Sequence, residues 1–182
     1  MENYLESIIK QFKYYQGLGK KAMDQVDEKS LFMEPGINSN SMAVIVKHLH
    51  GNMLSRWKDF LGSDGEKTWR NRDDEFEDTL TDRTAVYERW EEGWECLFNA
   101  IENLKADQLD HIIYIRNEGH TVMEAINRQL CHYSYHVGQL VLLGKIIKGS
   151  DWTSLSIPKG QSAAFNQQKF KEEKSRKHFT DS

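Results

Sequence analysis

The most informative residues of this sequence are two histidines, His132 and His136, in the apolar segment RQLCHYSYHVGQLVLLGKIIK at residues 128–148. Residues four apart on an α-helix project from one side of it, about one turn apart, so both imidazoles can point at the same place. Two neutral imidazoles that converge in this way are the minimum chelate for a transition metal such as zinc. An isolated pair of this spacing also arises by chance, with each ring hydrogen-bonded to backbone or water. A metal site therefore requires a third ligand nearby.

A third ligand is available in VIVKHLHGNMLSRW at residues 44–57, which contains His48 and His50. Two residues along a helix correspond to a rotation of about 200°, so at most one of these histidines faces the protein core. His48 shares its side of the helix with the apolar residues Val44 and Ile45, whereas His50 lies on a mixed face. The sequence therefore predicts His48 as the ligand and His50 as a surface or helix-interface residue.

The remaining histidines and the two cysteines carry weaker signals. His111 and His120 flank a predicted β-ribbon; His120 could reach the mouth of a site or pair within the ribbon, and its role stays open. His178 lies in the charged C-terminal segment, where we expect a solvated ring. Cys96 and Cys131 are too few and too far apart for a disulfide framework, and neither has a visible partner for nucleophilic catalysis.

Four long segments with apolar residues at helical spacing must position these side chains. The predicted helices cover residues 2–26, 41–61, 82–104 and 122–147. Asn40 or Ser41 is the expected N-cap of the second helix, and Thr81 that of the third. A short β-ribbon is predicted over residues 111–122, around the turn Asn117-Glu118-Gly119. Together these elements predict an all-α fold, a four-helix bundle of the kind that builds metal sites from facing helices.

Length and composition restrict the class of protein. The 182 residues fit one domain, and 38% hydrophobic and 29% charged residues are typical of a globular, helical chain. A net charge of −4 argues against a dedicated nucleic-acid binder, and no apolar run is long enough for a membrane span. The N-terminal residues lack the features of a secretion signal, so we expect a cytoplasmic protein with no nucleic-acid or membrane partner.

Domain organisation and oligomeric state follow from the same patterns. We expect a single folded domain over residues 1–165 and a charged, mobile tail over residues 166–182. The last predicted helix is apolar nearly all round, because Leu130, Val137 and Val141 lie far from its histidine side. A helix buried on all sides in so small a bundle indicates a further contact surface, which predicts a homodimer.

Four motifs carry a family resemblance: KHLHGNM at residues 47–53, WRNRDDEFE at 69–77, HYSYHVGQL at 132–140 and WTSLSIPKG at 152–160. On these motifs the chain resembles the DinB/YfiT-like superfamily of metalloenzymes, and within it the branch known as the domain of unknown function DUF1572. The resemblance implies an up-down-down-up four-helix bundle whose metal ligands are His48, His132 and His136, the same three residues that the helix faces select. His50 departs from the pattern, because a small residue is more usual at this place.

By this resemblance, the three imidazoles would hold a divalent transition metal, most naturally zinc or nickel, with iron or cobalt as alternatives. Three protein ligands leave a coordination position open, which is the catalytic rather than the structural pattern. Characterised members of the superfamily are transferases and isomerases that use low-molecular-weight thiols such as bacillithiol or mycothiol. The leading hypothesis is a thiol S-transferase acting on a small-molecule substrate; the alternatives are a metal-activated-water hydrolase and a non-enzymatic metal-binding or stress-associated bundle. Candidate hydrogen-bonding partners for the ligand rings are Asn52, Gln129 and Gln139.

Overall fold

The computed structural model describes residues 2–181 and is mostly helical, with one short two-stranded antiparallel ribbon. Its helices are α1 (Glu2–Asp24), α2 (Glu28–Leu31), α3 (Met42–Trp57), α4 (Arg83–Ile101), α5 (Val122–Lys148) and α6 (Ser162–Lys169). The strands are β1 (Ile112–Ile115) and β2 (Glu118–Thr121). Within the described residues, no helix is long and apolar enough to cross a membrane.

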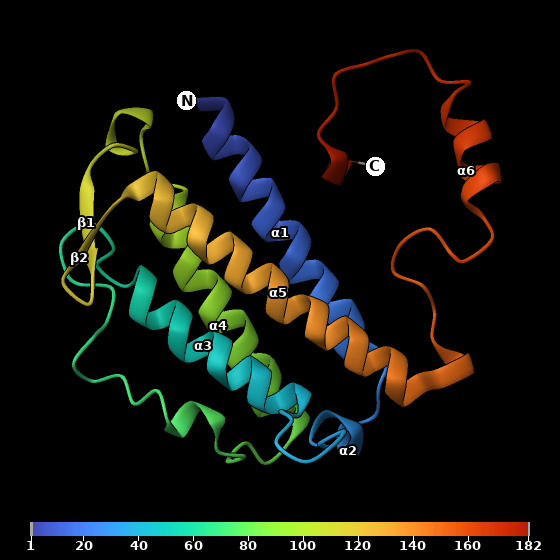
Figure 1. The fold of residues 1–182 in the computed structure, drawn as a ribbon, viewed down its shortest axis with the longest axis horizontal. Coiled ribbons are helices and arrows are strands. Elements are labelled where there is room, and N and C mark those ends of the chain that lie inside the picture. Colours follow the sequence, from blue (N-terminus) through green and yellow to red (C-terminus); the bar gives the residue numbers. More distant parts are fainter. Residues whose placement is uncertain (1, 182) are drawn as a thin grey trace.

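The four long helices α1, α3, α4 and α5 lie side by side, with α3 packed on α4 and α1 packed on α5. In Figure 1, α1 and α5 run in one direction and α3 and α4 in the other. Because α3 and α4 are consecutive and parallel, the chain between them must return along the length of α3, which is about 24 Å for 16 residues. The returning segment, residues 58–82, therefore lies beside α3, and its 3-10 turn η1 (Asp74–Phe76) packs on that helix.

Side-chain caps set where the helices begin. The Ser41 hydroxyl accepts a hydrogen bond from the backbone N–H of Val44 at 3.2 Å, as expected for the N-cap of α3. The N-cap of α4 is Asp82, not Thr81 as predicted, because the Asp82 carboxylate accepts from the Ala85 N–H at 2.9 Å. Helix α3, the second of the four predicted helices, ends at Trp57 and not at residue 61.

The predicted β-ribbon is present, but its turn lies earlier than the glycine indicated. Arg116 and Asn117 occupy the turn with φ of 55° and 61°, while Glu118 and Gly119 belong to β2. Two successive residues in the left-handed region are typical of a tight two-residue hairpin turn, which asparagine tolerates. The Asp64 carboxylate accepts hydrogen bonds from both backbone N–H groups of this turn, each at 2.8 Å. The returning segment thus holds the ribbon in place.

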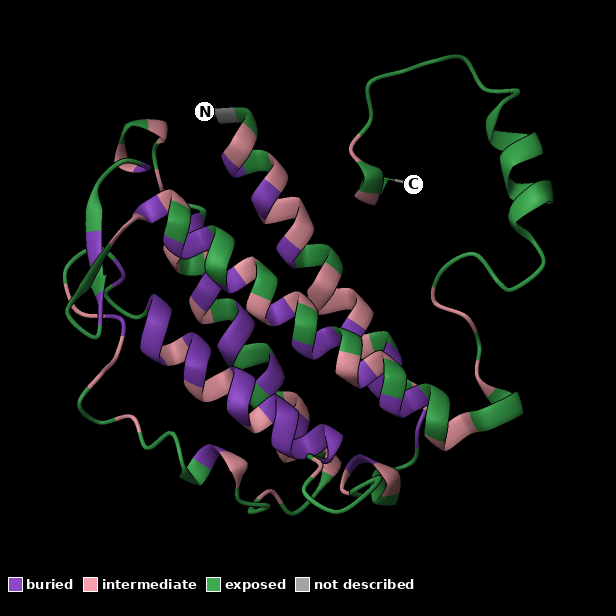
Figure 2. Cartoon of the chain, viewed as in Figure 1, coloured by how far each residue is buried: buried purple, intermediate pink, exposed green. Residues whose placement is uncertain are grey.

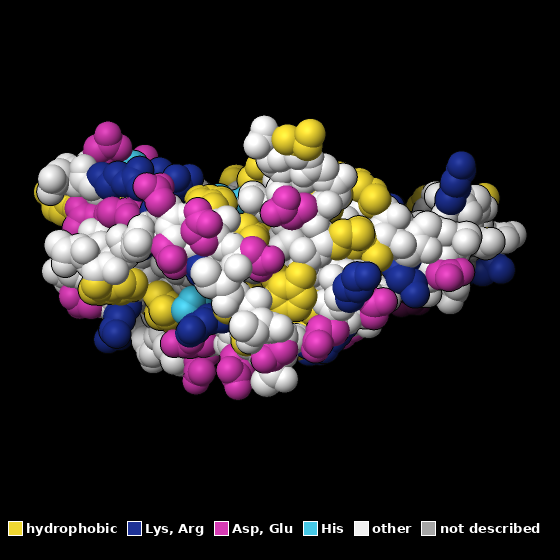
Figure 3. Space-filling view, turned by 90° about the horizontal axis from the view of Figure 1, so that it is seen from below, with side chains coloured by type: hydrophobic (Ala, Val, Ile, Leu, Met, Phe, Trp, Pro, Cys, Tyr) yellow, Lys and Arg dark blue, Asp and Glu magenta, His cyan; other side chains and the backbone are white. Residues whose placement is uncertain are grey.

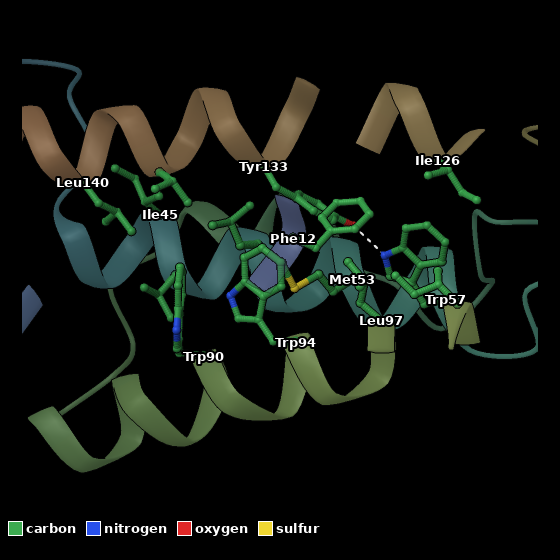
Figure 4. Packing of buried hydrophobic residues seen from close by; sticks show 14 of the residues in the cluster. Phe12, Ile45, Met53, Trp57, Trp90, Trp94, Leu97, Ile126, Tyr133 and Leu140 are labelled. Carbon is green, nitrogen blue, oxygen red and sulfur yellow. Dashed lines mark hydrogen bonds between the residues drawn. The ribbon is translucent and has the colours of Figure 1, made fainter. Parts of the chain in front are cut away.

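Aromatic packing and two hydrogen bonds of Tyr133 hold α5 against the other long helices. Helix α3 is buried along most of its length (Figure 2), and the rings of Phe12, Trp94 and Tyr133 pack edge to face in the core between the helices (Figure 4). The indole N–H of Trp57 donates to the Tyr133 hydroxyl at 2.9 Å, and this hydroxyl donates to Asn52 at 3.0 Å. These bonds set the rotation of α5 about its axis, and with it the direction of the neighbouring residue, His132.

The C-terminal segment is exposed over most of its length but ends against α1. The imidazole of His178 is hydrogen-bonded to the Ser7 hydroxyl at 3.0 Å, and Lys10 forms an ion pair with Asp181 at 3.0 Å. His178 is therefore half-buried, not solvated as expected. The division of the chain into a domain and a tail at residue 165 stays a prediction.

Candidate metal centre

The structure brings the three predicted ligands together between α3 and α5. The Nε2 atom of His132 lies 3.3 Å from Nε2 of His48 and 3.1 Å from Nε2 of His136. One ring nitrogen from each of the three residues falls within 4.8 Å of the others. His48 and His136 are buried, and His132 is half-buried at the edge of the cluster.

The spacing of these nitrogens fits a single metal ion. A tetrahedral zinc ion with Zn–N bonds of about 2.0–2.1 Å holds any two ligand nitrogens about 3.3 Å apart. The two separations that involve His132, 3.3 and 3.1 Å, are close to this value. The nitrogens of His48 and His136 also lie within 4.8 Å of each other, so the three rings are close enough to share one ion.

Hydrogen bonds on the far side of two rings orient their lone pairs inward. The Nδ1–H of His48 donates to the Glu75 carboxylate at 2.9 Å, and the Nδ1–H of His136 donates to the Gln139 side-chain oxygen at 2.7 Å. Because each acceptor requires the hydrogen on Nδ1, the Nε2 atoms of both rings carry lone pairs. Since Nε2 of His132 carries at most one hydrogen, it can donate to only one of these two lone pairs. This donor set, three nitrogens with acceptors fixing the outer ring atoms, is the arrangement that proteins use around bound zinc.

Glu75 comes from the returning segment, and its role could not be predicted from the sequence pattern. It is buried, and Arg70 donates to its two oxygens at 2.7 and 2.9 Å. Burial raises the pKa of the Glu75 carboxyl, but hydrogen bonds from His48 and Arg70 outweigh burial and hold that pKa below its usual value. Glu75 is therefore ionised near neutral pH. The ring of Phe76 stacks on His48 with centroids 4.8 Å apart, which completes the support of this ligand.

Burial keeps the two histidines of α5 neutral. Mainly through desolvation, and secondarily through the neighbouring imidazoles, the pKa of His132 falls to about 3. Desolvation likewise lowers the pKa of His136 to about 4, although the bond to Gln139 opposes the shift. At pH 7 both rings are thus uncharged, as metal ligation requires.

A cavity of about 450 Å³ opens directly onto the three histidines. Side chains from α3, the returning segment, the ribbon turn and α5 line it, among them five arginines: Arg56, Arg70, Arg72, Arg116 and Arg128. Figure 3 shows Lys and Arg side chains gathered near one end of the molecule (dark blue, left). This concentration of arginines is not visible in the sequence, because they are scattered over 73 positions of the chain, from residue 56 to residue 128.

Two further histidines lie outside the cluster. His50 pairs with Glu92 of α4 at 2.8 Å, in agreement with the expectation of a helix-interface residue. His120 lies in β2 opposite Ile113, and its Nε2 atom is buried without a hydrogen-bond partner among the described residues. Neither histidine belongs to the group that could hold a metal ion.

Of the three glutamine and asparagine side chains predicted to orient the ligands, one does so. Gln139 accepts from His136, as described above. Asn52 instead accepts from Tyr133, within the core. Gln129 is buried, and its side-chain oxygen has no hydrogen-bond partner among the described residues.

Comparison with known families gives one match, to the family model described as a protein of unknown function (DUF1572), over residues 1–161. The chain belongs to the DUF1572 family. No curated protein and no solved structure matches it. The match spans α1 to α5 and includes all three histidines of the cluster, so this DUF1572 chain contains its candidate centre entirely within the family region.

Proposed function

We propose that His48, His132 and His136 bind a divalent transition metal in a DinB/YfiT-like four-helix bundle formed by α1, α3, α4 and α5. The observation that carries the proposal is the convergence of three imidazole nitrogens, with the Nδ1 atoms of His48 and His136 fixed by hydrogen bonds. Zinc or nickel suits three neutral imidazoles best, with iron or cobalt as alternatives.

We further propose that the protein is a thiol S-transferase. When bound, the ion would lower the pKa of a thiol or water molecule at its open position. The cavity beside the cluster supports a small-molecule substrate, because a structural metal is normally enclosed by four protein ligands. In the transfer, the thiolate sulfur forms a bond to an electrophilic carbon of the co-substrate. The leaving group departs with its electron pair, and the thiol proton passes to solvent.

The protein's own residues would hold this reaction in place. Glu75 and Gln139 keep Nε2 of the rings of His48 and His136 free to ligate. Phe76 covers one face of His48 and shields it from water. Tyr135, which receives a hydrogen bond from Gln139 at 3.0 Å, lines the cavity with its hydroxyl available to a substrate.

Metal content tests the ligand assignment. Tag-free protein should contain close to one zinc, nickel, iron or cobalt ion per chain by inductively coupled plasma mass spectrometry. The His48→Ala variant and the His132→Ala/His136→Ala double variant should fall to background, while circular dichroism shows the helical fold retained. His50→Ala is the matched control and should keep its metal. Metal retained in His48→Ala, or metal absent from the wild type after reconstitution, would contradict the proposal.

Activity assays separate the three functional classes. A transferase consumes a chromogenic aryl chloride only when a low-molecular-weight thiol is supplied, releasing one chloride for each C–S bond formed. A hydrolase cleaves a nitrophenyl ester without thiol. A structural metal gives neither activity, but chelation then lowers the melting temperature by many degrees. The proposal requires the first outcome and its loss in His132→Ala/His136→Ala.

We also propose that the protein is a homodimer. Helix α5 exposes the apolar side chains of Leu142 and Ile146, each with more than half of its surface open to solvent. Covering them with a second copy would remove this area from water. Size-exclusion chromatography with light scattering should give twice the 21.3 kDa chain mass at micromolar concentration. A monomer would refute the proposal.

A further inference from the structure

We infer that the cavity beside the histidine cluster binds a small molecule bearing a carboxylate or phosphate group, held by Arg72, Arg116 and Arg128. This inference names the substrate class of the site and rests on the function proposed above. It follows from the charge of the cavity wall, from the arginines that remain unpaired, and from one buried acceptor without a partner.

The wall of the cavity is strongly positive. Its lining includes five arginines and, within the described residues, no lysine, aspartate or glutamate. Glu66 and Glu75 form ion pairs with these arginines, and Asp64 binds the backbone of the Arg116 turn, all three from outside the cavity lining. Five positive charges are thus accompanied by three negative ones, a difference of two. An anion entering this cavity therefore meets a large favourable potential.

Two of the five arginines are occupied by protein partners. Arg70 is buried and binds Glu75 through two hydrogen bonds, and Arg56 is buried and pairs with Glu66 at 3.0 Å. Arg56 thereby joins α3 to the returning segment, whereas Arg70 links Glu66 and Glu75 within that segment. These ion pairs leave little capacity for a ligand, so Arg56 and Arg70 contribute chiefly to the shape and charge of the wall.

The other three arginines keep donors available for a ligand. Arg72 and Arg128 form no ion pair with any described residue, and the Arg72 guanidinium lies over the ring of Phe76, 5.1 Å from its centroid. Arg128 precedes His132 by one turn of α5, so it lies on the same side of the helix as the ligand. Arg116 shares Glu66 with two other arginines, at 3.4 Å, while 59% of its side chain is exposed. Guanidinium groups match carboxylate and phosphate oxygens in planar, paired hydrogen bonds.

Hydrogen bonds fix the position of Arg116. Arg116 stands on the ribbon turn whose backbone Asp64 holds through two hydrogen bonds, so it belongs to a fixed hairpin and not to a loose loop. Helices α3 and α5 run in opposite directions (Figure 1), which brings Arg56, the ribbon turn and Arg128 to one end of the molecule. The histidines lie further along the same cavity. A ligand anchored at the arginine end would thus extend toward the metal ligands.

Gln129 provides an independent indication of a ligand. Only 3% of its surface is exposed, it lines the cavity, and its side-chain oxygen lacks a hydrogen-bond partner among the described residues. Buried acceptors are nearly always satisfied, so this oxygen requires a donor. A ligand with a hydroxyl or amide N–H beside its anionic group supplies one.

Isothermal titration of the metal-loaded protein with succinate, inorganic phosphate and neutral succinamide tests the inference. Succinate or phosphate should bind, with succinamide at least tenfold weaker, and the preferred anion distinguishes a carboxylate from a phosphate site. Binding should weaken at least tenfold in Arg72→Ala/Arg128→Ala and fall as salt rises from 20 to 500 mM, since added ions screen the attraction. Arg89→Ala, which removes an exposed arginine of α4, is the matched control and should bind as the wild type does.

Metal analysis of the same samples separates this inference from the proposed function. Arg72→Ala/Arg128→Ala should keep its metal, and His132→Ala/His136→Ala should lose metal yet retain anion binding. Anion binding that disappears only with the metal would overturn the inference and leave the metal site intact. Anion-selective binding by a wild-type protein that holds no metal would support the arginine site and refute the metal proposal. Equal binding of succinate and succinamide, or no binding at millimolar concentration, overturns the inference.

Discussion

His48 and the histidine pair on α5 meet in one cluster, but the residues that support them lie at very different distances along the sequence. His132 and His136 are one helical turn apart, and the nearest support of His136 is Gln139, three residues further along the same helix. His48 lies on another helix, and its support, Glu75, comes from a segment 27 residues later in the chain. One half of the centre is thus local in sequence, and the other depends on the path of the chain between α3 and α4.

The two halves also differ in how firmly they are held. Around His48, a buried carboxylate, a buried guanidinium and a stacked ring leave the imidazole little freedom. Around His132 and His136 the supporting side chains, Gln139 and Tyr135, are partly or largely exposed. We therefore expect the His48 side to set the position of the ion and the α5 side to adapt to the ion and its substrate.

The largest effect should come from removing Glu75. Glu75→Ala removes two hydrogen bonds from the buried Arg70 guanidinium and leaves it Glu66 alone, which should cost about 3 kcal/mol of unfolding free energy. Loss of the acceptor for His48 should also weaken metal binding about 10- to 100-fold. Urea denaturation and competitive chelator titration measure the two effects. Glu77→Ala, an exposed neighbour in the same segment, should change neither, and a similar loss there would break the comparison.

Lowering the pH should destabilise the protein through the two histidines of α5. In the metal-free protein, the pKa of His132 is about 3 and that of His136 about 4, against an ordinary value of 6.5. Below pH 6.5 the unfolded chain therefore binds more protons than the folded protein, and stability falls as pH decreases toward 4. The slope should reach about 1.4 kcal/mol per pH unit for each histidine, with no change above pH 7. Urea denaturation in the presence of a chelator, from pH 8 to pH 4.5, measures this slope. If stability falls equally steeply in His132→Gln/His136→Gln, other groups cause the acid effect.

The same contrast explains what the sequence could predict. The four long helices, the ribbon and the Ser41 cap follow from periodicity and local hydrogen bonding, which act over a few residues. The three histidines could be selected because each helix presents an apolar side, and that side shows which residues face inward. His50 was set aside by the same reasoning, and its pairing with Glu92 agrees.

Glu75 and the arginine-lined wall could not be predicted in this way. The segment of residues 62–81 is rich in acidic side chains, and no periodicity distinguishes Glu75 from Asp74 or Glu77. Its role arises because α3 and α4 are parallel, which forces this segment back along α3. The ribbon turn was misplaced for a related reason: the left-handed residues are held by Asp64, a contact across 52 positions of the chain.

A smaller loss of stability and metal affinity, expected for Gly51→Ala, tests whether the surroundings of His48 are rigid. A Cβ atom at Gly51 would lie 2.7 Å from Cδ of Glu75 and so displace the carboxylate. Gly51→Ala should therefore lose about 1–3 kcal/mol of stability and weaken metal binding about tenfold. Gly138→Ala on α5 meets nothing within 4 Å and should gain up to about 1 kcal/mol from helix propensity. Thermal denaturation and chelator titration measure both variants. Equal changes in stability and metal affinity at the two glycines would argue that His48 is not held more rigidly than the histidines of α5.

The smallest effect should come from the support on α5. Gln139→Ala removes the acceptor for His136, but the bond lies in a partly exposed place, so stability should change by less than about 1 kcal/mol. Because water can enter and accept from Nδ1 of His136, metal affinity should fall only a few-fold, well below the loss in Glu75→Ala. Chelator competition on the two variants under identical conditions compares the halves directly. A loss in Gln139→Ala as large as that in Glu75→Ala would show that α5, and not the segment crossing α3, positions the ion.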